Sequence, residues 1–381
     1  MQIWWVRKAL ASPAILQACA CTAAEHKALL EYNQGVSSDI IQKSIKDSIY
    51  LRIEAIKSLN DLLQDPVRSA TQSTVLHVNV LMANEALGAH FEVLQAHKEG
   101  LKTLVSMMGG LIELEHPMLS TIYQGSLLLA ALQNTKPIFP IIAKYRDAIV
   151  HEPQMFHNED IKYDCVVPAT LECLGARFTT ASWNVEIHPT MKSLIETFRR
   201  LVRHFEIGTL FPSIVAPTDN DLFVIFQHEL LTTHYASESP CNPNLDECLR
   251  HSLLIYLYIR VSHLQELPIM QNMVENFRHS LSGLSYLYTT APDLLFWILF
   301  IGGMASQGYS SHPWFMSHIA IVAHDLELED WEQVRTLLGG FFYTDQAGQT
   351  AAEDLWTEVL LLAGPYRYIA PKSRILAMEI D

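Results

Sequence analysis

The sequence has little of what zinc sites, membrane spans and DNA-binding surfaces require. None of its six cysteines forms a Cys-x-x-Cys pair, so the ligand spacing of common zinc sites is missing. Its longest apolar run, 294–305, falls short of the ~18 residues that a membrane-spanning helix needs. Lys and Arg number 26 against 41 Asp and Glu, which gives a net charge of -15. Because DNA binding requires cations that displace phosphate counterions, this balance argues against direct nucleic-acid contact.

The densest group of basic residues is Arg199, Arg200 and Arg203. On a helix these residues would form one small patch, which suits a solvated face or a partner contact. The six cysteines are interpreted as reduced and mostly buried thiols, because a chain of 381 residues needs no disulfides to complete its core.

Motifs that carry enzyme chemistry are also missing. His228 and His234 are six residues apart, so they cannot face one metal ion as histidines four apart on a helix do. Gly303 to Gly308 resembles a nucleophile elbow with one residue too many, and we interpret it as a glycine-rich turn. No phosphate-binding glycine motif occurs, and the 17 histidines are dispersed. The sequence therefore predicts no catalytic, cofactor-binding or metal-binding residue.

Helical periodicity dominates the chain. Ile41, Ile45, Ile49, Ile53, Ile56 and Leu63 recur at spacings of three, four and seven, which predicts a long helix with one apolar stripe. Asp39 can cap this helix, and Asp65-Pro66 ends it. Further helices are predicted over residues 71–87, 91–108, 117–134, 189–205, 253–267, 270–288, 293–301 and 331–341.

No convincing run of alternating apolar residues and no fixed repeat period appears. We therefore predict an all-α fold, a helical-hairpin array or bundle of roughly fifteen helices with no significant sheet. The prolines fit connectors inside one assembly. The sequence thus predicts a single domain over residues 1–381, with residues 210–220 as the place of any subdivision.

Two segments share their pattern with one family. The first combines His97, Gly100 and Leu101 with the stop at Gly109-Gly110. The second runs from Leu294 through Trp297 to Gly302-Gly303, then Trp314-Phe315, Trp331 to Arg335, Phe341 to Tyr343 and Leu355-Trp356. Together they resemble the fungal-specific transcription factor domain, the regulatory region that follows a zinc binuclear cluster. The likeness spans about residues 10–360, whereas the six closely spaced cysteines of the cluster are absent.

The resemblance implies a transcription regulator that works in the nucleus, although no clear basic import signal is present and the cytoplasm stays an alternative. It implies action through protein contacts or ligand sensing, with other transcription regulators, a homo- or heterodimer partner or a small-molecule effector as partners. It also implies structural roles: His97, Trp297 and Trp331 as anchors, and Gly100, Gly109, Gly110, Gly302 and Gly303 as helix stops or close-packing sites. A helical scaffold outside transcription is the alternative function, and an enzyme is not expected.

Overall fold

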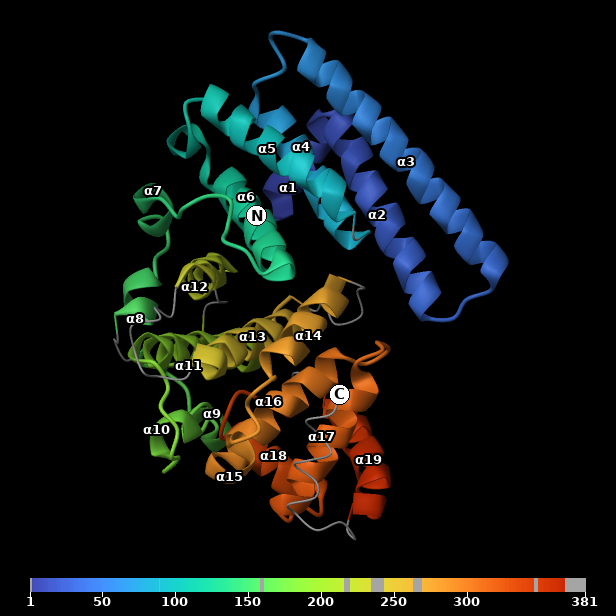
Figure 1. Ribbon diagram of the computed structural model, residues 1–381. Helices are drawn as coiled ribbons and strands as arrows, with labels where there is room; N and C mark the ends of the chain where they lie inside the picture. Colours follow the sequence, from blue (N-terminus) through green and yellow to red (C-terminus); the bar gives the residue numbers. More distant parts are fainter. Residues whose placement is uncertain are drawn as a thin grey trace. The chain divides into compact units, whose positions relative to one another are not determined.

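The computed structural model describes residues 2–88, 90–157, 161–215, 220–233, 243–262, 269–345 and 349–366. Over these residues the chain forms 19 α-helices, one 3₁₀ helix and no strand, so the all-α prediction is confirmed (Figure 1). Five of the helices have only four or five residues. Such single turns leave no periodic signal in a sequence, which explains why about fifteen helices were predicted.

The described residues pack as two compact units. Unit 1 comprises those of Met1–Glu152, Gln227–Thr232 and Glu266–Met270, and unit 2 comprises those of Pro153–Phe226, Thr233–Gln265 and Gln271–Asp381. The division into two compact units describes packing and does not test the bounds of a regulatory domain. One domain over residues 1–381, with a subdivision near 210–220, therefore stays a prediction.

Unit 1 is built around α4. Its helices are α1 (Gln2–Ala11), α2 (Pro13–Asn33), α3 (Ser38–Gln64), α4 (Gln72–Leu87), α5 (Phe91–Met107), η1 (Leu111–Glu113), α6 (His116–Gln133) and α7 (Ala143–Arg146). Helix α2 forms a hairpin with α3, and α4 packs against α2, α3, α5 and α6 (Figure 1). Twelve of the sixteen residues of α4 are therefore buried, as expected for a helix with neighbours on several sides.

The long helix α3 ends before Asp65 as predicted, but it begins at Ser38, so Asp39 lies in its first turn and does not cap it. Its apolar stripe is also not core. Ile45, Ile49 and Ile53 are 43%, 52% and 47% exposed, whereas the small residues Ser44 and Ser48 are buried. Small side chains allow two helix backbones to approach closely, and α3 packs against α2 through that face. Periodicity found the helix correctly but could not tell which face is buried.

One buried histidine makes the stability of unit 1 depend on pH. His77 of α4 is fully buried, and its Nε2 lies 3.1 Å from the carbonyl oxygen of Ala55. Burial lowers the pKa of His77 to about 4, against about 6.5 in an unfolded chain. Because the folded pKa is depressed, the unfolded chain binds more protons between these values, and stability falls as the pH falls from about 6.5 to 4.

In the wild type, His77 takes up about one proton on unfolding between pH 6.5 and 4, which lowers the free energy of unfolding by about 2–3 kcal/mol across this range. We expect His77→Leu to lose this contribution to the slope of unfolding free energy against pH. Urea titrations of the full chain across this range, followed by helical circular dichroism, measure the slope. Val78→Ala, a cavity at the adjacent buried position, should lower stability without changing that slope. An unchanged slope in His77→Leu would contradict the prediction.

Unit 2 is built around α16. Its helices are α9 (Ala169–Glu172), α10 (Arg177–Thr180), α11 (Pro189–Leu210), α13 (Pro243–Arg260), α15 (Leu287–Thr290), α16 (Pro292–Ala305), α17 (His312–Asp325), α18 (Trp331–Gly339) and α19 (Gln349–Tyr366). The bounds of α8 (Glu152–Phe156), α12 (Asn220–Thr232) and α14 (Ile269–Ser280) include residues of both units. Helix α16 packs against α13, α15, α17, α18 and α19, and every residue from Leu294 to Ala305 is buried.

The basic residues of α11 differ from the sequence interpretation. Arg199 donates from Nε to the carbonyl oxygen of Leu174 at 2.7 Å, and Arg200 donates to that of Met155, also at 2.7 Å. The guanidinium of Arg203 lies 5.9 Å from the centre of the Tyr163 ring. All three side chains are half-buried, so they join neighbouring segments of unit 2 instead of forming a solvated patch.

Candidate functional site

The first family-like motif lies in unit 1 around a buried carboxylate. Glu85 of α4 is fully buried and accepts two hydrogen bonds from Arg52, at 2.9 and 2.6 Å. Nδ1 of His90 lies 3.0 Å from Glu85 Oε2, and Nε2 of His97 lies 3.9 Å from Oε1. Burial opposes the charged form of Glu85, but His97 and Arg52 outweigh it and hold its pKa below the usual value. His97 thus helps to stabilise a buried charge that links α3, α4 and α5.

The glycines of this motif differ from one another. Gly109 and Gly110 follow α5 with φ angles of 92°, a region that side chains with a Cβ rarely adopt. Gly110 donates its N–H to the carbonyl oxygen of Val105, which satisfies part of the helix end. Gly100 lies inside α5, and a Cβ there would meet nothing within 4 Å. The two glycines at the end of α5 therefore shape a turn, and Gly100 neither stops the helix nor allows a close approach.

The second motif forms the aromatic core of unit 2. Trp297 of α16 is fully buried and donates from Nε1 to the carbonyl oxygen of Phe342 at 3.1 Å. Its ring stacks on Phe341 and meets Phe178 edge to face, each with a centroid distance of 5.5 Å. Trp331 begins α18, and its ring centre lies 6.0 Å from that of Tyr343. Both tryptophans therefore hold the segment after α18 against the unit.

Gly302 and Gly303 lie inside α16, where α17 approaches. A Cβ on Gly302 would overlap the ring of Phe315, and one on Gly303 would lie 2.8 Å from Ile319 Cδ1. Phe315 and Ile319 are fully buried residues of α17 and have little room to move. These two glycines are thus close-packing positions within the helix, which continues to Ala305.

We expect Gly302→Ala to lower the free energy of unfolding by about 1–3 kcal/mol, because the added methyl group overpacks the contact with Phe315. Gly100→Ala is the matched comparison. It should raise stability by about 0.5–1 kcal/mol, because alanine favours a helix where space is open. Denaturant titrations of both variants measure the difference, and effects of equal sign would contradict this interpretation.

Gly303 lies inside α16, so the predicted glycine-rich turn is reduced to a turn around Gly308. The end of α16 places a serine, a histidine and a glutamate in a chain. Oγ of Ser306 lies 3.0 Å from Nδ1 of His312, and Nε2 of His312 lies 3.1 Å from Oε2 of Glu358. Oγ also donates to the carbonyl oxygen of Gly303 at 3.0 Å, and Ser306 is fully buried. A nucleophile must be reachable by its substrate, so these contacts fit a helix end and not an active site. His234, which was compared with His228 as a metal-binding pair, lies outside the described residues, and so does Cys241.

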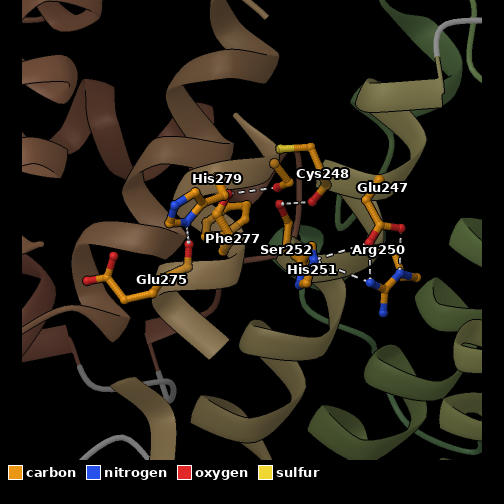
Figure 2. Close-up of polar contacts among 9 residues, drawn as sticks. Glu247, Cys248, Arg250, His251, Ser252, Glu275, Phe277 and His279 are labelled. Carbon is orange, nitrogen blue, oxygen red and sulfur yellow. Dashed lines mark hydrogen bonds and ion pairs between the residues drawn. The ribbon is translucent and has the colours of Figure 1, made fainter. Parts of the chain in front are cut away.

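A second polar network consists of bonds within α13 and bonds within α14 (Figure 2). The two helices meet through the rings of His251 and Phe277, whose centres lie 6.3 Å apart. Arg250 donates from Nε to Glu247 at 2.8 Å, and Nε2 of His251 lies 3.3 Å from the same carboxylate. Burial disfavours the charged form of Glu247, but Arg250 and His251 hold its pKa below the usual value. Burial also lowers the pKa of His251, so this ring is neutral at pH 7.

The thiol of Cys248 lies in the same network and is fully buried. Burial raises the pKa of Cys248 far above its ordinary value, which keeps the thiol protonated and unreactive. On α14, Nδ1 of His279 lies 2.7 Å from the carbonyl oxygen of Glu275 (Figure 2). No group of three or more potential metal ligands occurs within the described ranges.

A pocket lies beside this network, among α14, α15, α16 and α17. Its volume is about 400 Å³, within the range of small-molecule sites. Its polar lining comes from Arg278, His279, Ser282, Ser285, Tyr288 and His318, and its apolar lining from Leu281, Leu284, Leu295, Leu299 and Trp314. The exposed residues His279, Ser282 and Gly283 place its mouth at the surface.

The segment that contains the pocket and Trp297 matches a known protein family. Residues 225–339 match the fungal specific transcription factor domain. The matched segment contains Trp297, Gly302, Gly303 and Trp331, all of the lining of the pocket, and the network of Figure 2. The predicted resemblance is therefore confirmed over residues 225–339, and this segment indicates a role in the regulation of transcription.

The fungal transcription factor segment ends at Gly339, the last residue of α18. His97, Gly100, Gly109 and Gly110 lie outside it, so whether they belong to a family motif stays a prediction. The comparisons with curated proteins and with solved structures gave no match. A transcription factor domain is not an enzyme family, and no helix of the described residues is both long and apolar enough to cross a membrane.

Sequence reasoning missed the pocket. Its lining is spread from Arg278 to His318 over four helices and the turn between α14 and α15, so no short motif unites it. Proximity of such residues is set by helix packing, which a single sequence does not reveal.

Proposed function

We propose that this chain regulates transcription in the nucleus by contacting another protein, and that it does not bind DNA directly. The observation that carries the proposal is the match of residues 225–339 to a transcription factor domain. The net charge of -15 and the internal bonds of Arg199 and Arg200 support the exclusion of DNA contact.

The exposed stripe of α3 supports a protein partner. Ile45, Ile49 and Ile53 form adjacent exposed positions on one helix face, and the half-buried Ile41 and Ile56 extend it. Contiguous apolar surface of this kind is uncommon on monomers and is typical of interaction sites. No other described element of unit 1 buries these three side chains.

The charges beside the stripe favour one kind of partner. At 100° per residue, Lys46 and Lys57 fall next to Ile53 along the outer edge of the stripe. Both lysines are exposed, and Lys57 also pairs with Glu54 at 2.7 Å. A basic rim beside an apolar stripe is complementary to an amphipathic helix with an acidic rim. The proposed partner of α3 is therefore a helix of that type on another transcription regulator.

A reporter experiment tests this function. The chain is fused to an unrelated DNA-binding domain, and transcription is measured from a promoter that carries the matching site. We expect the wild-type fusion to change reporter output, and Ile45→Ser/Ile49→Ser/Ile53→Ser to abolish that change because the apolar contact is lost.

The control is Val150→Ser/Val166→Ser, which replaces isolated residues that are 85% and 90% exposed and lie outside the stripe. It should leave the output unchanged. Nuclear imaging of a tagged chain accompanies the assay. No reporter change by the wild-type fusion, with the protein excluded from the nucleus, would overturn the proposal and favour a scaffold outside transcription.

A further inference from the structure

The pocket among α14, α15, α16 and α17 has a charge character opposite to that of the chain. None of the twelve described residues that line it is acidic, whereas acidic residues exceed basic ones by 15 in the whole sequence. Arg278 supplies a positive charge at the lining, and Ser282 and Ser285 supply hydroxyl groups. Glu275, one turn before Arg278, accepts a hydrogen bond from its Nε at 3.1 Å, which holds the guanidinium in place.

Tyr288 adds a hydrogen-bond donor to this wall. Burial raises the pKa of Tyr288, and the charge of Asp325 raises it further, so the phenol stays protonated at neutral pH. A protonated phenol and a guanidinium that line one pocket are both donors suited to a carboxylate. Arg278 and Tyr288 both contribute to the lining of the same pocket.

The remaining lining is apolar and aromatic. Leu295 and Leu299 of α16 are buried residues at the base of the pocket lining. The rings of Trp314 and His318 stack with a centroid distance of 3.8 Å, and His318 Nδ1 lies 2.7 Å from the carbonyl oxygen of Trp314. Burial lowers the pKa of His318, so the stacked pair is neutral at pH 7 and presents a flat, weakly polar surface.

We propose that this pocket binds a small organic carboxylate with an aromatic or short alkyl body. The carboxylate pairs with Arg278 and Tyr288, and the body lies against Leu295, Leu299 and Trp314. As an effector site, the pocket rests on the proposed regulatory function, whereas the binding itself does not. The volume of about 400 Å³ suits a ligand of this size.

Titration calorimetry on the full chain with 4-phenylbutanoate tests the inference. We expect saturable 1:1 binding with a Kd on the order of 1 mM or tighter, as for a ligand of this size. The amide of the same acid, which keeps the body and removes the charge, should bind at least ~10-fold more weakly. Equal binding of acid and amide, or no saturable binding of the acid, would overturn the inference.

Variants locate the site. Arg278→Gln should weaken binding of 4-phenylbutanoate at least ~10-fold, because the charged hydrogen bond is lost. Lys192→Gln removes an exposed positive charge of unit 2 outside the pocket and should leave the affinity unchanged. Ser285→Trp fills the partly exposed lining without touching the core and should abolish binding, with circular dichroism confirming that both variants are folded. Full affinity in Arg278→Gln and Ser285→Trp would place the ligand elsewhere and overturn the assignment.

The calorimetry and the reporter assay fail independently. If 4-phenylbutanoate binds without any reporter effect, the ligand-binding inference holds and its regulatory role is contradicted. If the reporter responds but 4-phenylbutanoate does not bind, the proposed function holds and the ligand-binding inference is contradicted. A reporter output that changes with 4-phenylbutanoate in the wild-type fusion, and not in Arg278→Gln, supports both.

Discussion

Trp297→Ala is expected to lower the free energy of unfolding by about 3–5 kcal/mol, the range found for large aromatic residues in cores. The indole is fully buried, stacks on Phe341 and bonds to the carbonyl oxygen of Phe342. Alanine leaves a large cavity and an unsatisfied carbonyl group in the centre of unit 2. Denaturant titration with circular dichroism measures the loss.

Trp297→Phe separates the two contributions. It keeps most of the ring volume and removes only the donor to Phe342, so a loss of about 1–3 kcal/mol is expected. A loss below about 1 kcal/mol in Trp297→Ala would show that the aromatic cluster repacks around the site, contrary to the close packing described here.

Arg260→Met should cost about 3–5 kcal/mol, because it leaves a charge buried without its partner. Glu206 is fully buried and accepts hydrogen bonds from Nε and Nη2 of Arg260, at 2.6 and 2.7 Å. Thr344 donates a further hydrogen bond to Glu206 at 3.0 Å. In the Arg260→Met variant, the Glu206 carboxylate loses both bonds from Arg260 and keeps the one from Thr344.

The double variant Glu206→Leu/Arg260→Met is the control. Replacing both charges with apolar groups of similar size is often neutral, so most of the lost stability should return. Denaturation of the wild type, both single variants and the double variant completes the thermodynamic cycle. Additive losses in the double variant would show that the two side chains do not stabilise each other.

Some helix ends could be predicted from local chemistry, although the cap expected at Asp39 is not formed. Asp330 accepts a hydrogen bond from the N–H of Gln333 at 2.9 Å, as the capping pattern indicates. Pro292 begins α16, and α4 ends at Leu87 before Gly88. These features depend on a few neighbouring residues, so one sequence contains the information.

Features set by packing between distant segments were predicted poorly. Helix α13 begins at Pro243, ten residues before the apolar run that indicated it, because its first turns carry polar residues that are nonetheless mostly buried. The stripe of α3 lies on the exposed side, since α2 packs against its serines. Gly100 shares a motif with Gly109 but lacks its strained backbone.

The candidate site shows the same division. Trp297, Gly302 and Gly303 were found as motif residues, and the structure places them in the core of unit 2. The side chains that line the pocket carry no motif, and only helix packing brings Arg278, Tyr288 and Trp314 together. A family pattern therefore identifies the framework of this segment more readily than the residues that would face a ligand.

The enclosure of α16 has a consequence for motion. A helix with neighbours on all sides cannot expose its amides by fraying at the surface, because any opening must displace α13, α17 and α19. Its central amides, around Ile298, should exchange with solvent deuterium only when unit 2 unfolds as a whole. The outer turns of α3, with one face in water, should exchange much sooner. Exchange rates would thus rank the helices by enclosure, with α16 as the slowest reporter of cooperative unfolding in unit 2.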